Sequence, residues 1–246
     1  MDELTIQRLN AINRQFYQTT AQAFDQTRGA AWPGWERLLS DLKRPHDGAT
    51  FAVLDVGCGN GRFGVFLGDH LKLEIDYHGV DNNPALLDRA FEALRDAPGL
   101  AATVERRDVV LSPPERGSYD LVAAFGLMHH IPGAANRRAF LRRLAERLKP
   151  GGVLAFACWR FYEYDRFRKR LIDWPADLAP KVEQHDYLLD WRRGAVAWRY
   201  CHYVDEAEHQ VLISATGLDE LRTFRADGSD NHMNRYSLLR KPQHKP

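Results

Sequence analysis

The sequence lacks the features that mark several classes of protein. It has only three cysteines, Cys58, Cys158 and Cys201, and no CxxC pair, so neither a disulfide framework nor a structural zinc site is expected. Its longest apolar runs, near 121–128 and 153–159, have about eight residues. A membrane-spanning helix needs roughly 20. The first residues show no basic segment followed by an apolar run, so no secretory signal is expected.

The chain also lacks an excess of charge of either sign. Lys and Arg number 34 and Asp and Glu number 33, which gives a formal net charge of +1 and excludes a basic-tail protein or an acidic disordered one. Hydrophobic residues make up 44% of the 246 residues, as in ordinary globular proteins. This length suits one large domain, or one domain with an addition. The few scattered cysteines favour a reducing, cytoplasmic location.

The middle of the chain alternates between two kinds of segment. Short apolar runs at 51–56, 75–80, 102–106, 119–125 and 153–158 predict strands, and periodic patterns at 61–71, 84–94 and 134–148 predict helices. This alternation predicts an α/β fold with a mostly parallel, doubly wound sheet and helices on both faces.

The two ends of the chain differ from this middle. Residues 1–45 are expected to form an N-terminal helical lid, and residues 46–159 the core. The charged and aromatic segment 160–195 is interpreted as an insertion or lid. Residues 196–246 are expected to complete the sheet, with strands at 195–204 and 233–239 and a helix near 205–216.

The densest chemical signal is the run Val53-Leu54-Asp55-Val56-Gly57-Cys58-Gly59-Asn60-Gly61. Glycines at this strand-to-helix junction let the backbone approach a ligand, and the next helix offers free N–H groups. The spacing does not match the GxGxxG motif of dinucleotide-binding proteins, and no P-loop motif is present. Taken alone, the run is equally typical of a tight turn.

Two acidic residues follow the next two strands. Asp81 stands at the end of the second strand, where a carboxylate can accept hydrogen bonds from both ribose hydroxyls of a nucleotide-like ligand. Asp108 follows the third strand, where an adenine amino group would need an acceptor. Each could instead be a helix cap or a surface residue.

With Tyr119-Asp120-Leu121-Val122 and Leu148-Lys149-Pro150-Gly151-Gly152, these motifs resemble, in order over 51–158, the class I S-adenosylmethionine-dependent methyltransferases. The resemblance implies a Rossmann-like fold with a seven-stranded sheet and S-adenosyl-L-methionine as cofactor. It implies that Gly57, Gly59 and Gly61 line the methionine end, Asp81 the ribose, Asp108 with Val109 the adenine, and Phe125 the sulfonium. Asp55, Cys58 and Asn82 belong to the same motifs and complete the expected set.

A narrower resemblance involves the ends of the chain. Phe16-Tyr17, Phe24–Arg28, Trp32-Pro33, Met128-His129-His130, Arg199-Tyr200-Cys201-His202 and Asn234-Arg235-Tyr236 are similar to segments of the tRNA wobble-uridine methyltransferases, which esterify a carboxymethyl group. That family usually has Arg-Tyr-Tyr-His and Asn-Trp-Tyr, so Cys201 and Arg235 are departures. The resemblance places Tyr17 and Arg28 over the cofactor's carboxylate. The eukaryotic members work with a small zinc-containing activator, so such a partner is considered.

The substrate side holds the candidate catalytic residues. A carboxylate acceptor is already ionised and needs a cationic clamp, for which Arg199 and His202 are suited. A phenol or amine would need a base, and His129 or His130 could supply one or position the substrate. No metal ligands are assigned.

The segment 137–170 contains eleven basic and only three acidic residues, and aromatic residues interleave with its second half. Such a pattern suits RNA contact, although a solvated helix face gives the same signal. The preferred hypothesis is methyl-ester formation on a carboxymethyl-type wobble uridine of tRNA. A small-molecule carboxylate or phenol is the alternative substrate, and a non-catalytic accessory protein is a third interpretation.

Overall fold

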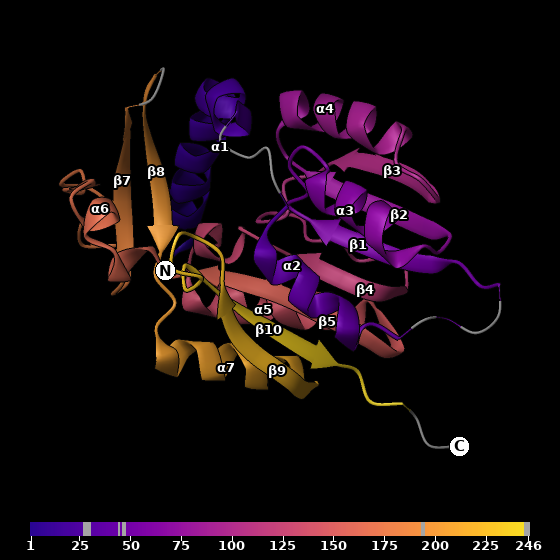
Figure 1. The fold of residues 1–246 in the computed structure, drawn as a ribbon. Helices are drawn as coiled ribbons and strands as arrows, with labels where there is room; N and C mark the ends of the chain where they lie inside the picture. The colour runs from indigo at the N-terminus through magenta and orange to yellow at the C-terminus, as the bar shows by residue number, and fades with distance from the viewer. Residues whose placement is uncertain (27–30, 44, 46–47, 193–194, 244–246) are drawn as a thin grey trace.

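The computed structural model describes residues 1–26, 31–43, 45, 48–192 and 195–243. Its main sheet has seven strands in the order β3–β2–β1–β4–β5–β10–β9 (Figure 1). These strands are β1 Phe51–Val56, β2 Ile75–Asp81, β3 Leu100–Arg106, β4 Tyr119–Ala124, β5 Leu148–Trp159, β9 Asp219–Ala226 and β10 Asn234–Arg240. The first five are parallel, and β10 is antiparallel to β5 and β9. The sheet order 3-2-1-4-5 and the helices on both faces establish the expected Rossmann-like fold.

Helices cover both faces of this sheet. Apolar side chains of α2 (Pro33–Leu38), α3 (Arg62–Leu71) and α4 (Pro84–Arg95) pack in one buried cluster. Those of α5 (Ala134–Glu146) and α7 (Glu206–Thr216) pack in a second cluster. The central strands β1 and β4 contribute to both clusters, which explains why their sequences are apolar almost throughout.

A second, smaller sheet stands beside the main one. Its strands β6 (Leu171–Ile172), β7 (Asp186–Arg192) and β8 (Val196–His202) are antiparallel in the order β6–β7–β8. The short helix α6 (Asp165–Arg168) precedes β6, and three 3₁₀ turns lie at Leu39–Asp41, Met128–His130 and Phe161–Glu163. Helix α1 (Glu3–Gln26) lies along β8 and also touches α4 (Figure 1).

The structure differs from the sequence expectation in the last third of the chain. The strand expected at 195–204 is β8, but it joins the small sheet instead of completing the main one. The seventh strand of the main sheet is β9, which the sequence did not indicate because its residues are mostly charged or polar. This strand lies at the edge of the sheet, where one side stays exposed and apolar alternation is not required. No helix within the described residues is long and apolar enough to cross a membrane.

Candidate active site

The glycine loop joins β1 to α3 at the carboxyl edge of the main sheet. Gly57, Gly59 and Gly61 all have left-handed backbone angles, with φ of +79°, +55° and +78°. A Cβ on Gly61 would come within 3.0 Å of Leu94 Cγ, so this glycine allows α4 to pack closely. A Cβ on Gly59 would meet no described atom within 4 Å. The loop therefore leaves open space for a ligand at Gly59.

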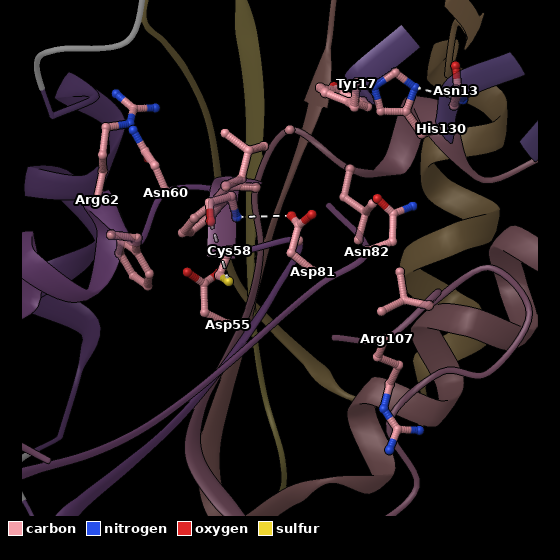
Figure 2. Close-up of a pocket in the computed structure, with 18 of the residues that line it drawn as sticks. Asn13, Tyr17, Asp55, Cys58, Asn60, Arg62, Asp81, Asn82, Arg107 and His130 are labelled. Carbon is pink, nitrogen blue, oxygen red and sulfur yellow. Dashed lines mark hydrogen bonds between the residues drawn. The ribbon is translucent and has the colours of Figure 1, made fainter. Parts of the chain in front are cut away.

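Two carboxylates, the buried Asp55 and the half-buried Asp81, flank this loop (Figure 2). Asp81 accepts hydrogen bonds from the backbone N–H of Gly59 at 3.0 Å and of Asn83 at 2.9 Å. Burial raises its pKa in spite of these bonds. Asp55 accepts a 2.6 Å bond from the Tyr77 hydroxyl, and burial raises the pKa of Asp55 to about 7.

Asp108 connects the pocket to the N-terminal helix. Its Oδ2 accepts from Asn10 Nδ2 at 2.8 Å and lies 3.4 Å from Arg14 Nη1, and its Oδ1 accepts from the Val110 N–H at 3.2 Å. Asn10 and Arg14 were not predicted from the sequence. They are one helical turn apart on α1. The four-residue spacing puts both side chains on one face of the helix, but the sequence does not show that this face meets Asp108.

The glycine loop, the carboxylates of Asp55, Asp81 and Asp108, and Asn10 line one cleft, whose open space including the mouth is about 1070 Å³. The cleft brings together most residues that the sequence predicted for the cofactor: Tyr17, Asp55, Gly57, Cys58, Gly59, Asp81, Asn82, Asp108, Val109 and Phe125. It also includes residues that the sequence reasoning missed, namely Asn10, Asn13, Trp32, Trp35 and Arg62. Arg28 lies outside the described residues.

His130 meets α1 at the inner end of this cleft. Its Nδ1 lies 3.0 Å from the Tyr200 carbonyl oxygen, which can only accept, so Nδ1 carries the proton. Nε2 then accepts from the Tyr17 hydroxyl at 2.9 Å (Figure 2). The Asn13 amide group also lies 3.1 Å from Nδ1, and this contact fits the same tautomer when the amide oxygen, which otherwise has no partner, faces the ring. The ring is thus fixed in one tautomer and holds α1 over the cleft.

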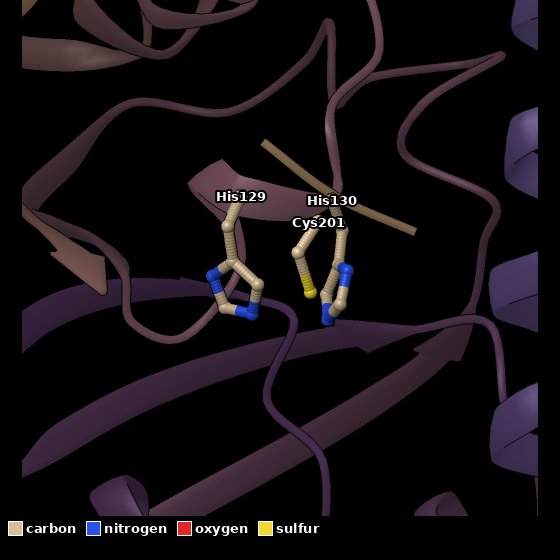
Figure 3. A group of neighbouring side chains, drawn as sticks. All are labelled: His129, His130 and Cys201. Carbon is tan, nitrogen blue, oxygen red and sulfur yellow. The ribbon is translucent and has the colours of Figure 1, made fainter. Parts of the chain in front are cut away.

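His129, His130 and Cys201 form a buried cluster whose nitrogen and sulfur atoms lie within 4.8 Å of one another (Figure 3). Two imidazoles and a thiol are ligands that a soft divalent metal accepts. However, both ring nitrogens of His130 already have hydrogen-bond partners. Burial also raises the pKa of the Cys201 thiol to about 11, so the thiol is neutral near pH 7. We therefore interpret the cluster as a packed polar group, of which His130 alone lines the cleft.

Arg199, on β8, is unusual because it is a charged residue that is buried. Its side chain points from β8 toward the main domain and is only 8% exposed. The guanidinium carbon lies 5.1 Å from the ring centre of Phe16 and 4.7 Å from that of Trp159. Its Nε is buried without a hydrogen-bond partner, and no carboxylate of the described chain lies within 4 Å of it. Such a buried cation can receive an anionic ligand.

His202 lies in a different environment. It is buried between Asp186 Oδ1 at 2.7 Å and Glu208 Oε2 at 2.6 Å, whereas Arg199 has no such carboxylate partners within the described chain; neither residue is among those that line the cleft. Arg137 pairs with the same Glu208 and with Glu183. The network joins β7 and β8 to α5 and α7, so the position of His202 suits a structural role better than substrate contact.

Comparisons with known proteins agree with this geometry. Residues 54–154 match a family described as "Methyltransferase domain". The chain is 31% identical over 149 residues to the mouse tRNA (carboxymethyluridine(34)-5-O)-methyltransferase, a match that covers 59% of this chain and 19% of the mouse protein. The Schizosaccharomyces pombe protein of the same name is 24% identical over 222 residues, covering 85% of this chain and 89% of that protein.

Solved structures share the fold. An S-adenosylmethionine-dependent methyltransferase from Methanosarcina mazei superposes with a TM-score of 0.65 at 17% identity, over 87% of this chain and 99% of the other. Such low identity supports the architecture alone. The chain also spans only about a fifth of the length of the mouse relative.

Proposed function

Because residues 54–154 match a methyltransferase domain, we propose that the protein is an S-adenosylmethionine-dependent methyltransferase that esterifies a carboxymethyl-type wobble uridine of tRNA. The observation that carries this proposal is Arg199, a buried cation between two aromatic rings. A carboxylate would supply the opposite charge that the described chain does not provide.

The residues of the cleft fit the cofactor, which supplies the methyl group when bound. Asp81 is placed to accept hydrogen bonds from ribose hydroxyls, and the open space at Gly59 suits the methionine end. Asp108 and Val109 would face the adenine, and Phe125 the sulfonium. Each side chain here binds or orients, and the apolar walls exclude water.

On the substrate side, Arg199 would hold the acceptor carboxylate by two parallel N–H bonds. A carboxylate attacks in its ionised form, so no base is required. His129 and His130 then act as positioning groups, with the His130 tautomer set by Tyr200 and Tyr17. His202 supports β8 through Asp186 and Glu208, three residues beyond the clamp and on the opposite face of the strand.

Two relatives support the choice of tRNA over other carboxylates. Both the mouse and the fission yeast proteins are named for carboxymethyluridine. A tRNA substrate also agrees with the cytoplasmic location expected from the sequence. The three cysteines are free, as is usual for proteins in a reducing compartment. We keep the small activator subunit of the eukaryotic enzymes as a candidate partner.

The test is transfer of labelled methyl groups from S-adenosylmethionine to small RNA. Label that mild alkali releases from RNA would support ester formation. Arg199→Met should lower this transfer at least tenfold, because a charge-assisted hydrogen-bond pair is worth about 1.5–3 kcal/mol. Cofactor binding should remain. Arg142→Met, on the surface of α5, is the matched control.

A small-molecule carboxylate remains the second candidate, because Arg199 is buried between aromatic rings, where a small anion fits more readily than a large one. Alkali-labile label in a metabolite extract, without label in RNA, would favour it. Label that resists alkali would point to a phenol or amine and to His129 or His130 as the base. If cofactor binds without transfer to either pool, even when the activator is added, the accessory interpretation would be preferred.

A further inference from the structure

The basic segment 137–170 divides into two parts with different surroundings. In the first part most cations are already paired with acids: Arg137, Arg143, Arg147 and Lys149 each contact a carboxylate. The end of α5 also lies at the amino edge of the main sheet, because the Arg147 carbonyl accepts from the Tyr119 N–H at the start of β4. Most of the positive charge in this part is therefore neutralised by neighbouring carboxylates, and the part lies at the edge of the sheet opposite the cleft.

The second part, around α6, holds cations without acidic partners. Within the described chain, no carboxylate lies within 4 Å of Arg166, Lys169 or Arg170. The two acids of this stretch are engaged elsewhere: Asp165 pairs with Arg168, and Glu163 with Arg160 and Arg225. Asp230 accepts from the Tyr164 hydroxyl. The stretch 166–170 therefore carries unneutralised positive charge.

This charge lies on the substrate side of the molecule. Arg166 stacks on Phe167 at 5.0 Å, and the Phe167 ring packs against Trp159 at 4.7 Å. Trp159 in turn forms one wall of the Arg199 site. Two aromatic rings thus separate the exposed Arg166 from the candidate carboxylate clamp.

An exposed tryptophan continues the same surface. Asp190 N–H donates to the Arg170 carbonyl, and Asp190 is opposite Trp198 in the register of β7 and β8. Arg170 and Trp198 therefore lie in one row across the small sheet, about 10 Å apart. Since neighbouring residues of a strand point to opposite faces, Trp198 points away from the Arg199 site. It is 50% exposed, which is unusual for so large an apolar side chain.

We propose that Arg166, Lys169, Arg170 and Trp198 form an RNA-contact surface on the outside of the small sheet. The cations would contact phosphates, and the Trp198 ring would stack on an unpaired base. This inference rests on the proposed tRNA substrate. One small sheet then presents the clamp on its inner face and the RNA-docking groups on its edge and outer face.

The test compares two double variants that each remove two cations without acidic partners. Arg166→Ala with Lys169→Ala should reduce the dependence of tRNA affinity on salt, lowering the log–log slope by about 1.4, or 0.7 for each single-strand phosphate contact. Arg138→Ala with Arg142→Ala, on α5, should leave the slope unchanged. Trp198→Ala should weaken tRNA binding at least fivefold with the slope unchanged, since stacking on a base is worth about 1–3 kcal/mol. Cofactor affinity, measured for every variant, reports folding.

The outcomes separate this surface from the proposed reaction. Equal slopes for both double variants would overturn the surface, even if the wild type esterifies tRNA. A reduced slope only in the α6 variant would support it, even if no ester forms. Failure of the wild type to bind tRNA would overturn the surface, while transfer to free carboxymethyluridine would show that the clamp acts on the carboxylate alone.

Discussion

Asp55 and Asp81 show how two like charges can share a cofactor site. Asp55 is buried and Asp81 half-buried beside the glycine loop, and desolvation raises the pKa of each. The charge of Asp81 raises the pKa of Asp55 further, to about 7. A cationic ligand next to them would favour the ionised forms. Cofactor binding and proton release should therefore be linked.

We expect the affinity for S-adenosylmethionine to rise between pH 5.5 and pH 7.5. Below pH 7 the neutral form of Asp55 predominates in the free protein and must lose its proton when the sulfonium binds, whereas above pH 7 it is already ionised. Calorimetric titrations in buffers of different ionisation enthalpy would measure the released proton. In Asp55→Asn the rise should be smaller. An equal rise in both proteins would contradict this role.

Asp81 should be the more severe loss, because it organises the loop as well as binding the ribose. Without its carboxylate the N–H groups of Gly59 and Asn83 lose their acceptor. We expect Asp81→Ala to lower cofactor affinity at least tenfold, since hydrogen bonds to a charged group contribute about 1.5–3 kcal/mol. Asp88→Ala, exposed on α4, is the control. Equilibrium binding that is unchanged in Asp81→Ala would exclude the proposed ribose site.

At the scale of elements, the small sheet depends on a buried charge network. Desolvation alone would lower the pKa of His202, but its hydrogen bonds to Asp186 and Glu208 raise it. Burial would raise the pKa of Glu208, but the bond from His202 and the charge of Arg137 lower it to about 2. The stabilisation that His202 provides is thus complete below the pKa that its imidazole has in the unfolded chain. It is lost as the pH rises through the higher pKa of the imidazole in the folded protein. The stabilisation that Glu208 provides is complete above the pKa of its carboxyl group in the unfolded chain, and it is lost as the pH falls toward 2.

His202→Asn should therefore change how stability depends on pH. From pH 6 to pH 9 the wild type should lose more of its free energy of unfolding than the variant, because only the wild type loses a proton from this network. Urea denaturation at both pH values measures the difference. His232→Asn, at an exposed histidine, should behave as the wild type. A parallel decline in all three proteins would assign the pH dependence to other groups.

The sequence predicts the helices and strands of this fold better than it predicts which strands pair with one another. The strands β1, β2 and β4 are recognisable because both their faces are buried or their ends carry glycine and acidic residues. Asp81 and Asp108, which the sequence singled out by their position after a strand, both line the cleft, and their contact with the cofactor stays a prediction. However, an alternating pattern does not specify which sheet a strand joins, so β8 was assigned to the wrong one. The aromatic site of Arg199 combines Phe16 and Trp159, which are far apart in sequence and meet only through tertiary packing.

At the scale of the whole molecule, the cleft joins the N-terminal helix to the carboxyl edge of the main sheet. Asn10, Asn13 and Tyr17 of α1 line it together with the glycine loop. Asn10 already contacts Asp108, and Tyr17 contacts His130. A ligand in the cleft would therefore touch both parts at once, and binding should stabilise α1 together with the core.

We expect cofactor at about 100 times its Kd to stabilise the fold by about 2.7 kcal/mol. For a chain of this size that corresponds to a rise in Tm of roughly 5–10 °C. Hydrogen exchange should slow in α1 and in the glycine loop alike, because residues of both line the cleft. At the same cofactor concentration Asp81→Ala should reduce both effects, and a tenfold weaker affinity would leave a stabilisation of about 1.4 kcal/mol. Slower exchange in the loop without any change in α1 would show that the helix is not part of the cofactor site, and its contacts with Asp108 and His130 would then serve only to attach it to the core.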